Sequence, residues 1–186
     1  MLRDVDAPQI TDNFLASWAD RIEPSLAFGS RGKKSFPAWK KELVAKVREL
    51  LGEFPEPAGL DPQLESVERT DSFRREKWII QTERDCRMPL YLLVPNGAKK
   101  GKTPAILCCH GHGAFGKDPV AGVVNGNPAA AQSISQHSYD YGRQMAERGF
   151  VTICPDWRSF GERVAYRTDP FPGRDTCNVH FIQHLI

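Results

Sequence analysis

The chain of 186 residues lacks the features that mark several common classes of protein. It has no apolar run near the ~18 residues that a membrane-spanning helix needs, and its N-terminus has no hydrophobic signal core. Its formal net charge is only +2 and no basic stripe stands out, so we expect neither a nucleic-acid nor a membrane partner. Its five cysteines include no C-x-x-C pair, which favours buried reduced thiols and a cytoplasmic location.

The first third of the chain has a helical pattern. Residues Thr11 to Leu51 are predicted to be helical, and from Trp39 to Leu51 the apolar side chains recur at helical spacing. Pro37 suits a first helical turn and Gly52 suits a helix end. A connector rich in proline and glycine follows, so we predict a helical N-terminal extension over residues 1–62 and a second domain over residues 63–186.

The second domain begins with strand-like segments. Three short runs have the composition of strands: Ser66–Thr70, Glu76–Gln81 and Pro89–Val94. The last two flank the polar turn Glu83-Arg84-Asp85, which predicts an antiparallel pair.

The pattern then changes to that of an α/β protein. Pro104–Cys109 is a continuous apolar run, typical of a strand buried on both faces. A helix is predicted from Ser138, as N-cap, to Arg148, and Phe150–Cys154 is a second buried strand. Strand, crossover helix and strand make a βαβ unit with parallel strands, so the predicted fold class is α/β.

A glycine-rich loop follows the first buried strand, and its chemistry has three interpretations. Gly111, Gly113 and Gly116 fit the G-x-G-x-x-G pattern of dinucleotide folds, but Pro119 and later glycines argue against a helix that starts at the loop. Gly111, Gly116 and Lys117 nearly make a phosphate-binding P-loop, but Asp118 replaces the required Ser or Thr. Nucleotide binding through this loop is therefore the weaker interpretation.

The third interpretation is an oxyanion hole. Glycines let backbone N–H groups approach a substrate carbonyl, and two such donors stabilise the oxyanion formed in acyl transfer. The loop amides of His112, Gly113 and Ala114 are the candidate donors. Side chains near the same strand ends are candidates for lining a substrate pocket, namely His110, Trp157 and Phe160.

Two strand-end motifs carry a resemblance to a known superfamily. His110-Gly111-His112-Gly113 and the segment from Tyr141 to Arg163, with Arg148-Gly149-Phe150 before a strand and Pro155-Asp156-Trp157-Arg158 after it, resemble an α/β-hydrolase. The closest branch is that of acetyl xylan esterases and dienelactone hydrolases. The resemblance covers roughly Leu64 to Ile186, and Ser159 stands where that family usually has glycine.

The resemblance implies a catalytic triad of Ser, Asp or Glu, and His, with the serine on a G-x-S-x-G turn. No such turn exists in the sequence, so we expect no catalytic residue in this chain and the triad beyond Ile186. A last helix, capped by Asp175 or Thr176, has no stop signal before Ile186. The sequence thus predicts the N-terminal part of an α/β-hydrolase fold, truncated before the nucleophile and inactive alone, from an enzyme that acts on small-molecule esters.

A protein without catalytic activity is an alternative to the esterase fragment. The chain could instead be a non-catalytic α/β remnant that acts as a binding or assembly module. The resemblance also implies that Pro104–Cys109 pairs with the strand that leads to the missing G-x-S-x-G turn. Without that strand, Pro104–Cys109 would leave an open edge at which copies of the chain could associate. We expect no cofactor and no metal, because His110 with His112 and His180 with His184 supply two ligands each without a third. Cys108 and Cys109, in the most buried run, are not expected to be nucleophiles.

Overall fold

The computed structural model describes residues 7–28, 35–112 and 115–164, and it divides the chain into two compact units, Met1–Pro55 and Glu56–Ile186. The helical N-terminal extension over residues 1–62 and the second domain over residues 63–186 stay predictions.

The first unit contains two helices, α1 (Ala7–Ala19) and α2 (Phe36–Leu51). Pro37 lies in the first turn of α2 and Gly52 ends it, as predicted. The ring of Trp39 contacts that of Phe28, with centroids 4.9 Å apart, and its indole N–H donates to the carbonyl of Leu26. The prediction of helix from Thr11 to Leu51 is wrong between Asp20 and Phe28, where the chain forms turns.

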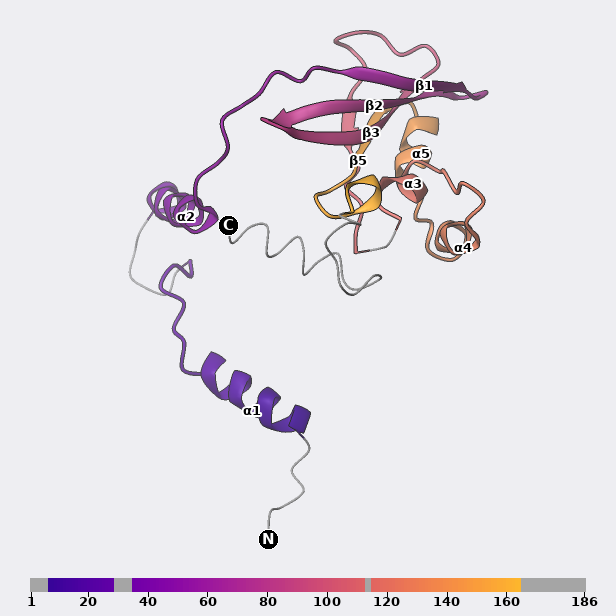
Figure 1. Cartoon of the computed structure of the whole chain (residues 1–186). Helices are drawn as coiled ribbons and strands as arrows, with labels where there is room; N and C mark the ends of the chain where they lie inside the picture. Colours follow the sequence, from indigo (N-terminus) through magenta and orange to yellow (C-terminus); the bar gives the residue numbers. More distant parts are fainter. Residues whose placement is uncertain (1–6, 29–34, 113–114, 165–186) are drawn as a thin grey trace. The chain divides into compact units, whose positions relative to one another are not determined.

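The second unit is built on a five-stranded sheet with the order β1-β2-β3-β5-β4. Figure 1 labels β1, β2, β3 and β5 of this sheet. Its strands are β1 (Gln63–Arg69), β2 (Phe73–Glu83), β3 (Cys86–Pro95), β4 (Ala105–Leu107) and β5 (Val151–Pro155). The first three are antiparallel and β3 pairs antiparallel with β5, whereas β4 and β5 are parallel. This arrangement confirms the predicted antiparallel entry followed by a parallel βαβ unit.

Three helices connect the two parallel strands: α3 (Lys117–Val120), α4 (Pro128–His137) and α5 (Tyr141–Glu147). Figure 1 shows them together beside the strands, and α5 packs against β3 and β5. A short 3-10 helix, η1 (Gly161–Arg163), follows the loop after β5. The core between helices and sheet consists of buried apolar side chains: Phe73, Tyr91, Leu93, Cys108, Val120, Ala121, Ala146 and Cys154.

The helix predicted from Ser138 to Arg148 is corrected in two respects. Ser138 is the left-handed C-cap of α4, and its N–H donates to the carbonyl of Ile134, so α5 begins only at Tyr141. Sequence reasoning missed α4 because Gly126 and Pro128 resemble helix breakers. Pro128 instead occupies the first turn, where proline is tolerated, and the Asn127 side chain caps the helix.

The predicted strand Pro104–Cys109 is shorter and less buried than expected. Only Ala105–Leu107 is strand, and the Leu107 side chain is 59% exposed. The reason is topological, because among the described residues β4 is an edge strand that pairs only with β5. The predicted helix from Asp175 to Ile186 lies outside the described residues. Within the described parts, no helix is both long enough and apolar enough to cross a membrane.

Candidate functional site

The candidate site lies where β4 and β5 end, because parallel neighbours bring their carboxyl ends to the same edge of a sheet. The loop after β4 contains His110 to Gly116, and the loop after β5 contains Asp156 to Phe160. Of the predicted oxyanion donors, His112 is described, whereas Gly113 and Ala114 lie outside the described residues.

His110 joins the two loops. Its side chain is buried, and its Nε2 accepts a hydrogen bond from the backbone N–H of Trp157 at 3.1 Å. Its Nδ1 lies 2.8 Å from the carbonyl oxygen of Gly111. Nε2 must be unprotonated to accept the bond from Trp157, and Nδ1 must carry a proton to donate to the carbonyl. Both conditions hold only in the neutral tautomer that has its proton on Nδ1. This side chain therefore serves as a link between loops.

The rings predicted to line a pocket come together in part. The Phe160 ring is buried and lies edge-on to His110, with centroids 5.2 Å apart, and to His112 at 6.4 Å. The side chain of Trp157 is 39% exposed. The structure thus gathers His110, His112 and Phe160 into one aromatic group, and Trp157 joins it through its backbone N–H.

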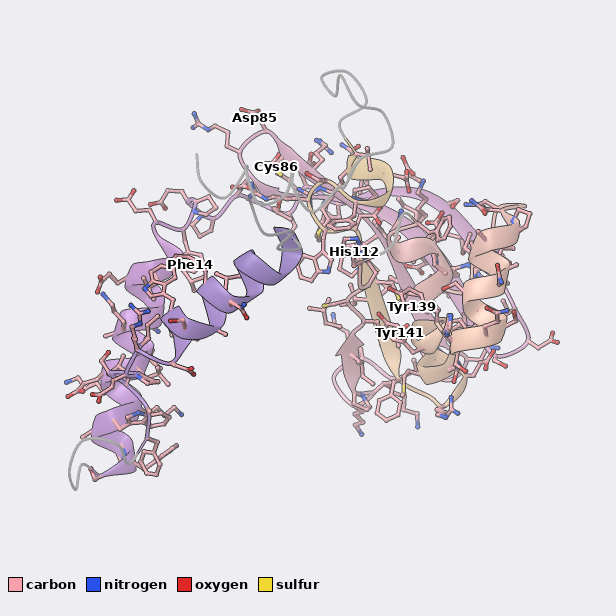
Figure 2. All side chains as sticks on the ribbon, turned by 90° about the horizontal axis from the view of Figure 1, so that it is seen from below. Phe14, Asp85, Cys86, His112, Tyr139 and Tyr141 are labelled. Carbon is pink, nitrogen blue, oxygen red and sulfur yellow. The ribbon has the colours of Figure 1, made fainter. Side chains whose placement is uncertain are left out.

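Two tyrosines that sequence reasoning missed hold the start of the glycine loop. The hydroxyl of Tyr139 accepts the N–H of Gly111 at 2.7 Å, and the hydroxyl of Tyr141 donates to the carbonyl of Cys109. Their rings pack edge-on, and Figure 2 shows them side by side. Burial raises the pKa of Tyr141, so its phenol stays protonated and remains a donor. No short motif marks this role, because it depends on where α5 begins.

The carboxylate of Asp156 forms the second link between the loops. Its Oδ1 accepts the backbone N–H of Lys117 at 2.8 Å, and its Oδ2 accepts the backbone N–H of Glu162 at 3.1 Å. Both loops approach it through glycine. A Cβ atom added to either Gly116 or Gly161 would lie 2.2 Å from Oδ1, and both glycines have positive φ angles of 55° and 54°. Only glycine fits at these two positions.

Lys117 is buried within this link. Its ammonium donates to Oδ2 of Asp156 at 2.8 Å and to the Glu162 carboxylate, and it lies 5.2 Å from the centroid of the Tyr91 ring. Burial alone would lower the pKa of Lys117, but the charge of Asp156 and the hydrogen bonds outweigh it and raise that pKa. A P-loop lysine must reach a bound phosphate, whereas this ammonium is enclosed by carboxylates, which argues against nucleotide binding.

The charged side chains after β5 and the short helix after the glycine loop complete the description of the two loops. The Asp156 carboxylate accepts backbone N–H groups of both loops. Arg158 forms a salt bridge with Glu83. One turn of helix does start at the glycine loop, since α3 begins at Lys117 and contains Pro119, although it is only four residues long.

The cysteines behave differently from one another. Cys108 and Cys154 are buried, but Cys109 is exposed, so the expectation that Cys108 and Cys109 are both buried is wrong for Cys109. Partial burial and the neighbouring Cys108 raise the pKa of the Cys109 thiol, which disfavours the nucleophilic thiolate. Among residues 7–28, 35–112 and 115–164, no three His, Cys, Asp or Glu side chains are placed to share a metal ion. The predicted pair His180 and His184 lies outside these ranges.

Two hollows flank the glycine loop. The smaller, of about 310 Å³, is mainly apolar and is lined by His112, Phe115, Gly116, Pro119, Ser133, His137 and Tyr139. The larger, of about 530 Å³, has the more polar lining Phe115, Asp118, Val124, Asn125, Asn127, Ala130, Gly161 and Glu162. His112 and Tyr139, both labelled in Figure 2, line the smaller hollow. A small organic substrate could therefore be accommodated beside the loop.

An antiparallel entry, a parallel pair with crossover helices, and a glycine-rich loop at the carboxyl edge define part of an α/β-hydrolase fold. The chain belongs to the Abhydrolase family, whose model matches residues 10–169. A search of curated proteins found no match.

A solved structure shares the fold. It is that of a proposed acetyl xylan esterase from Bacteroides fragilis NCTC 9343, which is 24% identical in sequence and superposes with a TM-score of 0.66. The alignment covers 84% of this chain but only 39% of the Bacteroides protein. The chain therefore corresponds to well under half of that relative.

Proposed function

We propose that this chain is the oxyanion-hole portion of a serine ester hydrolase that acts on small-molecule carboxylic esters. Family membership and the likeness to a proposed acetyl xylan esterase support the reaction class. The observation that carries the proposal is the position of the glycine loop at the shared carboxyl edge of β4 and β5, where hydrogen bonds of His110 and Gly111 hold its start. α/β-Hydrolases have an oxyanion donor in the loop at this place.

In this proposal the backbone amides of His112, Gly113 and Ala114 include the donor. Their positive ends would stabilise the negative charge that develops on the ester carbonyl oxygen when a serine attacks it. His110, His112, Trp157 and Phe160 would border the ester. The serine, its histidine base and the carboxylate that orients the histidine would come from outside these 186 residues, since no G-x-S-x-G turn occurs among them.

Two measurements test this proposal. The isolated chain should not hydrolyse p-nitrophenyl acetate above the rate in buffer, and it should not react with a fluorophosphonate probe. The nucleotide sequence downstream of the Ile186 codon should continue in frame into a G-x-S-x-G motif, and the complete product should hydrolyse the same ester. Turnover by the isolated chain that a serine reagent abolishes would show that the nucleophile is misplaced. An immediate stop codon and an inert product would favour the binding or assembly module.

A further inference from the structure

The glycine loop is attached to the loop after β5 on both sides of residues 111–116. On one side, His110 accepts the N–H of Trp157. On the other, the N–H of Lys117 donates to Asp156. The six residues between these attachments include the three proposed oxyanion donors, so both attachments hold described residues that flank the donors.

The second attachment is the more extensive. We call Asp156, Gly116, Lys117, Gly161 and Glu162 the Asp156 clasp. The Asp156 side chain is fully buried, and it receives the two backbone N–H groups of Lys117 and Glu162 as well as the Lys117 ammonium. A Cβ atom on Gly116 would also lie 2.8 Å from Cα of Gly161, so the two loop backbones meet directly.

We propose that Asp156 is a positioning residue for ester hydrolysis, because its carboxylate holds the C-terminal end of the oxyanion loop against the loop after β5. This inference rests on the function proposed above. Asp156 touches no substrate in this scheme and acts only through the loop. The near-match to a phosphate-binding motif at Gly116-Lys117 is then explained, since both residues belong to the clasp and not to a nucleotide site.

The clasp needs a carboxylate and not merely a polar side chain of that size. Both oxygens of Asp156 act as acceptors, one for the Lys117 N–H and the other for the Glu162 N–H and the Lys117 ammonium. An asparagine offers one acceptor oxygen and one donor group. In Asp156→Asn, an NH₂ group would therefore face an N–H or the ammonium, and one loop would lose its attachment.

The test compares Asp156→Asn with Asp118→Asn in the 186-residue chain. Asp118 is the matched control because its carboxylate also lies near the Lys117 ammonium, at 3.4 Å, and is removed by the same chemical change. In Asp156→Asn, hydrogen exchange of the Lys117 and Glu162 amides and of the 111–116 segment should accelerate by about ten-fold or more. In Asp118→Asn, those rates should change by less than about three-fold. Exchange in the β2–β3 hairpin should be unaffected by either.

The same two substitutions in the product of the complete reading frame test the catalytic consequence. Asp156→Asn should lower kcat for p-nitrophenyl acetate by about one hundred-fold at nearly constant KM, since oxyanion donors act in the transition state. If Asp156→Asn fails to fold, Gly161→Ala replaces it, because its added Cβ would displace the same carboxylate. Circular dichroism at the assay temperature establishes that each variant is folded.

The possible outcomes distinguish the role of Asp156 from the proposed esterase function. Unchanged exchange in Asp156→Asn would overturn the clasp. Faster exchange with an unchanged kcat would overturn the role of Asp156 as a positioning residue. A complete product that has no esterase activity would overturn the proposed function, and the exchange rates of the 186-residue chain would still decide whether Asp156 holds the loop.

Discussion

The imidazole Nε2 of His110 accepts the backbone N–H of Trp157, a residue 47 positions later in the chain. This single hydrogen bond joins the first residues after β4 to the first residues after β5. With the Asp156 clasp on the other side, it fixes the glycine loop to a neighbouring loop at two points. The two hydrogen bonds hold His110 and Lys117, the described residues that flank the glycine loop, against the loop after β5.

Removal of the imidazole acceptor should destabilise the second unit. In His110→Phe, the Trp157 N–H loses its partner, and the free energy of unfolding should fall by about 1–2 kcal/mol. His110→Gln keeps an acceptor oxygen, so its free energy of unfolding should fall by less than that of His110→Phe. Urea unfolding followed by tryptophan fluorescence measures both, with His137→Gln, an exposed histidine on α4, as the control. Equal midpoints for His110→Phe and the wild type would contradict the link.

A methyl group at Gly161 should be far more costly than one at an open glycine. Gly161→Ala would place its Cβ 2.2 Å from Oδ1 of Asp156, whereas a Cβ at Gly101 would meet nothing within 4 Å. Both positions have positive φ, so both pay the backbone cost of about 1 kcal/mol for alanine there. We expect Gly161→Ala to lose at least about 2 kcal/mol more than Gly101→Ala. A similar loss of unfolding free energy in both variants would show that the clasp can accommodate a methyl group at Gly161.

The charges around Lys117 predict how acid affects stability. Burial alone would raise the pKa of Glu162, but its hydrogen bonds to Lys117 and Lys77 outweigh burial and lower it. A carboxylate with a lowered folded pKa adds stability above its unfolded pKa, and this stability is lost as the pH falls through the folded pKa. Glu162→Gln should therefore lose less stability than the wild type between about pH 5 and pH 3.

Asp118 should have the opposite effect. Burial raises its pKa, so in the wild type the folded state takes up this proton more readily than the unfolded state and gains stability as the pH falls. Asp118→Asn removes that gain, so its free energy of unfolding should fall more steeply with decreasing pH than that of the wild type. Urea midpoints measured at several pH values compare the three proteins. If the urea midpoint depended on pH in the same way in Glu162→Gln and Asp118→Asn, the opposite effects expected for the two carboxylates would be contradicted.

The exposed edge at β4 predicts self-association of the isolated chain. Leu107 is exposed on a strand that pairs on one side only among the described residues. Such an edge can pair with another chain, and a lysine there opposes it. Sedimentation velocity should show mass that increases with concentration, and Leu107→Lys should reduce this increase more than Val67→Lys at the opposite edge strand, β1. A chain that stays monomeric at high concentration would rule out association at this edge.

The strands were predictable from the sequence because their signals are local. The turn at Glu83-Arg84-Asp85 and the apolar run Phe150–Cys154 predicted the β2–β3 hairpin and β5. Helix α4 was missed because Pro128 has opposite meanings in the interior and in the first turn of a helix. The local signal that separates the two cases is Asn127, because an asparagine N-cap directly before a proline is typical of a helix start.

The links at the site were not predictable for a different reason. Asp156 lies 39 positions from Lys117, and the bond between them exists only once β4 and β5 are neighbours. The motif that contains Asp156 marks a strand end, but nothing in it indicates the partner. The same holds for Tyr139, whose hydroxyl meets Gly111 across 28 positions.

The most direct test of the account is the turnover of p-nitrophenyl acetate by the complete product with Ala114→Pro or Ala114→Gly. Proline lacks the backbone N–H that glycine keeps. If the loop amides of residues 112–114 include an oxyanion donor and Ala114 supplies it, kcat should be about 10²–10³-fold lower in Ala114→Pro than in Ala114→Gly, with similar KM. His112→Pro and Gly113→Pro test the other two amides in the same way. Full kcat in all three proline variants would contradict the assignment of the oxyanion hole to this loop.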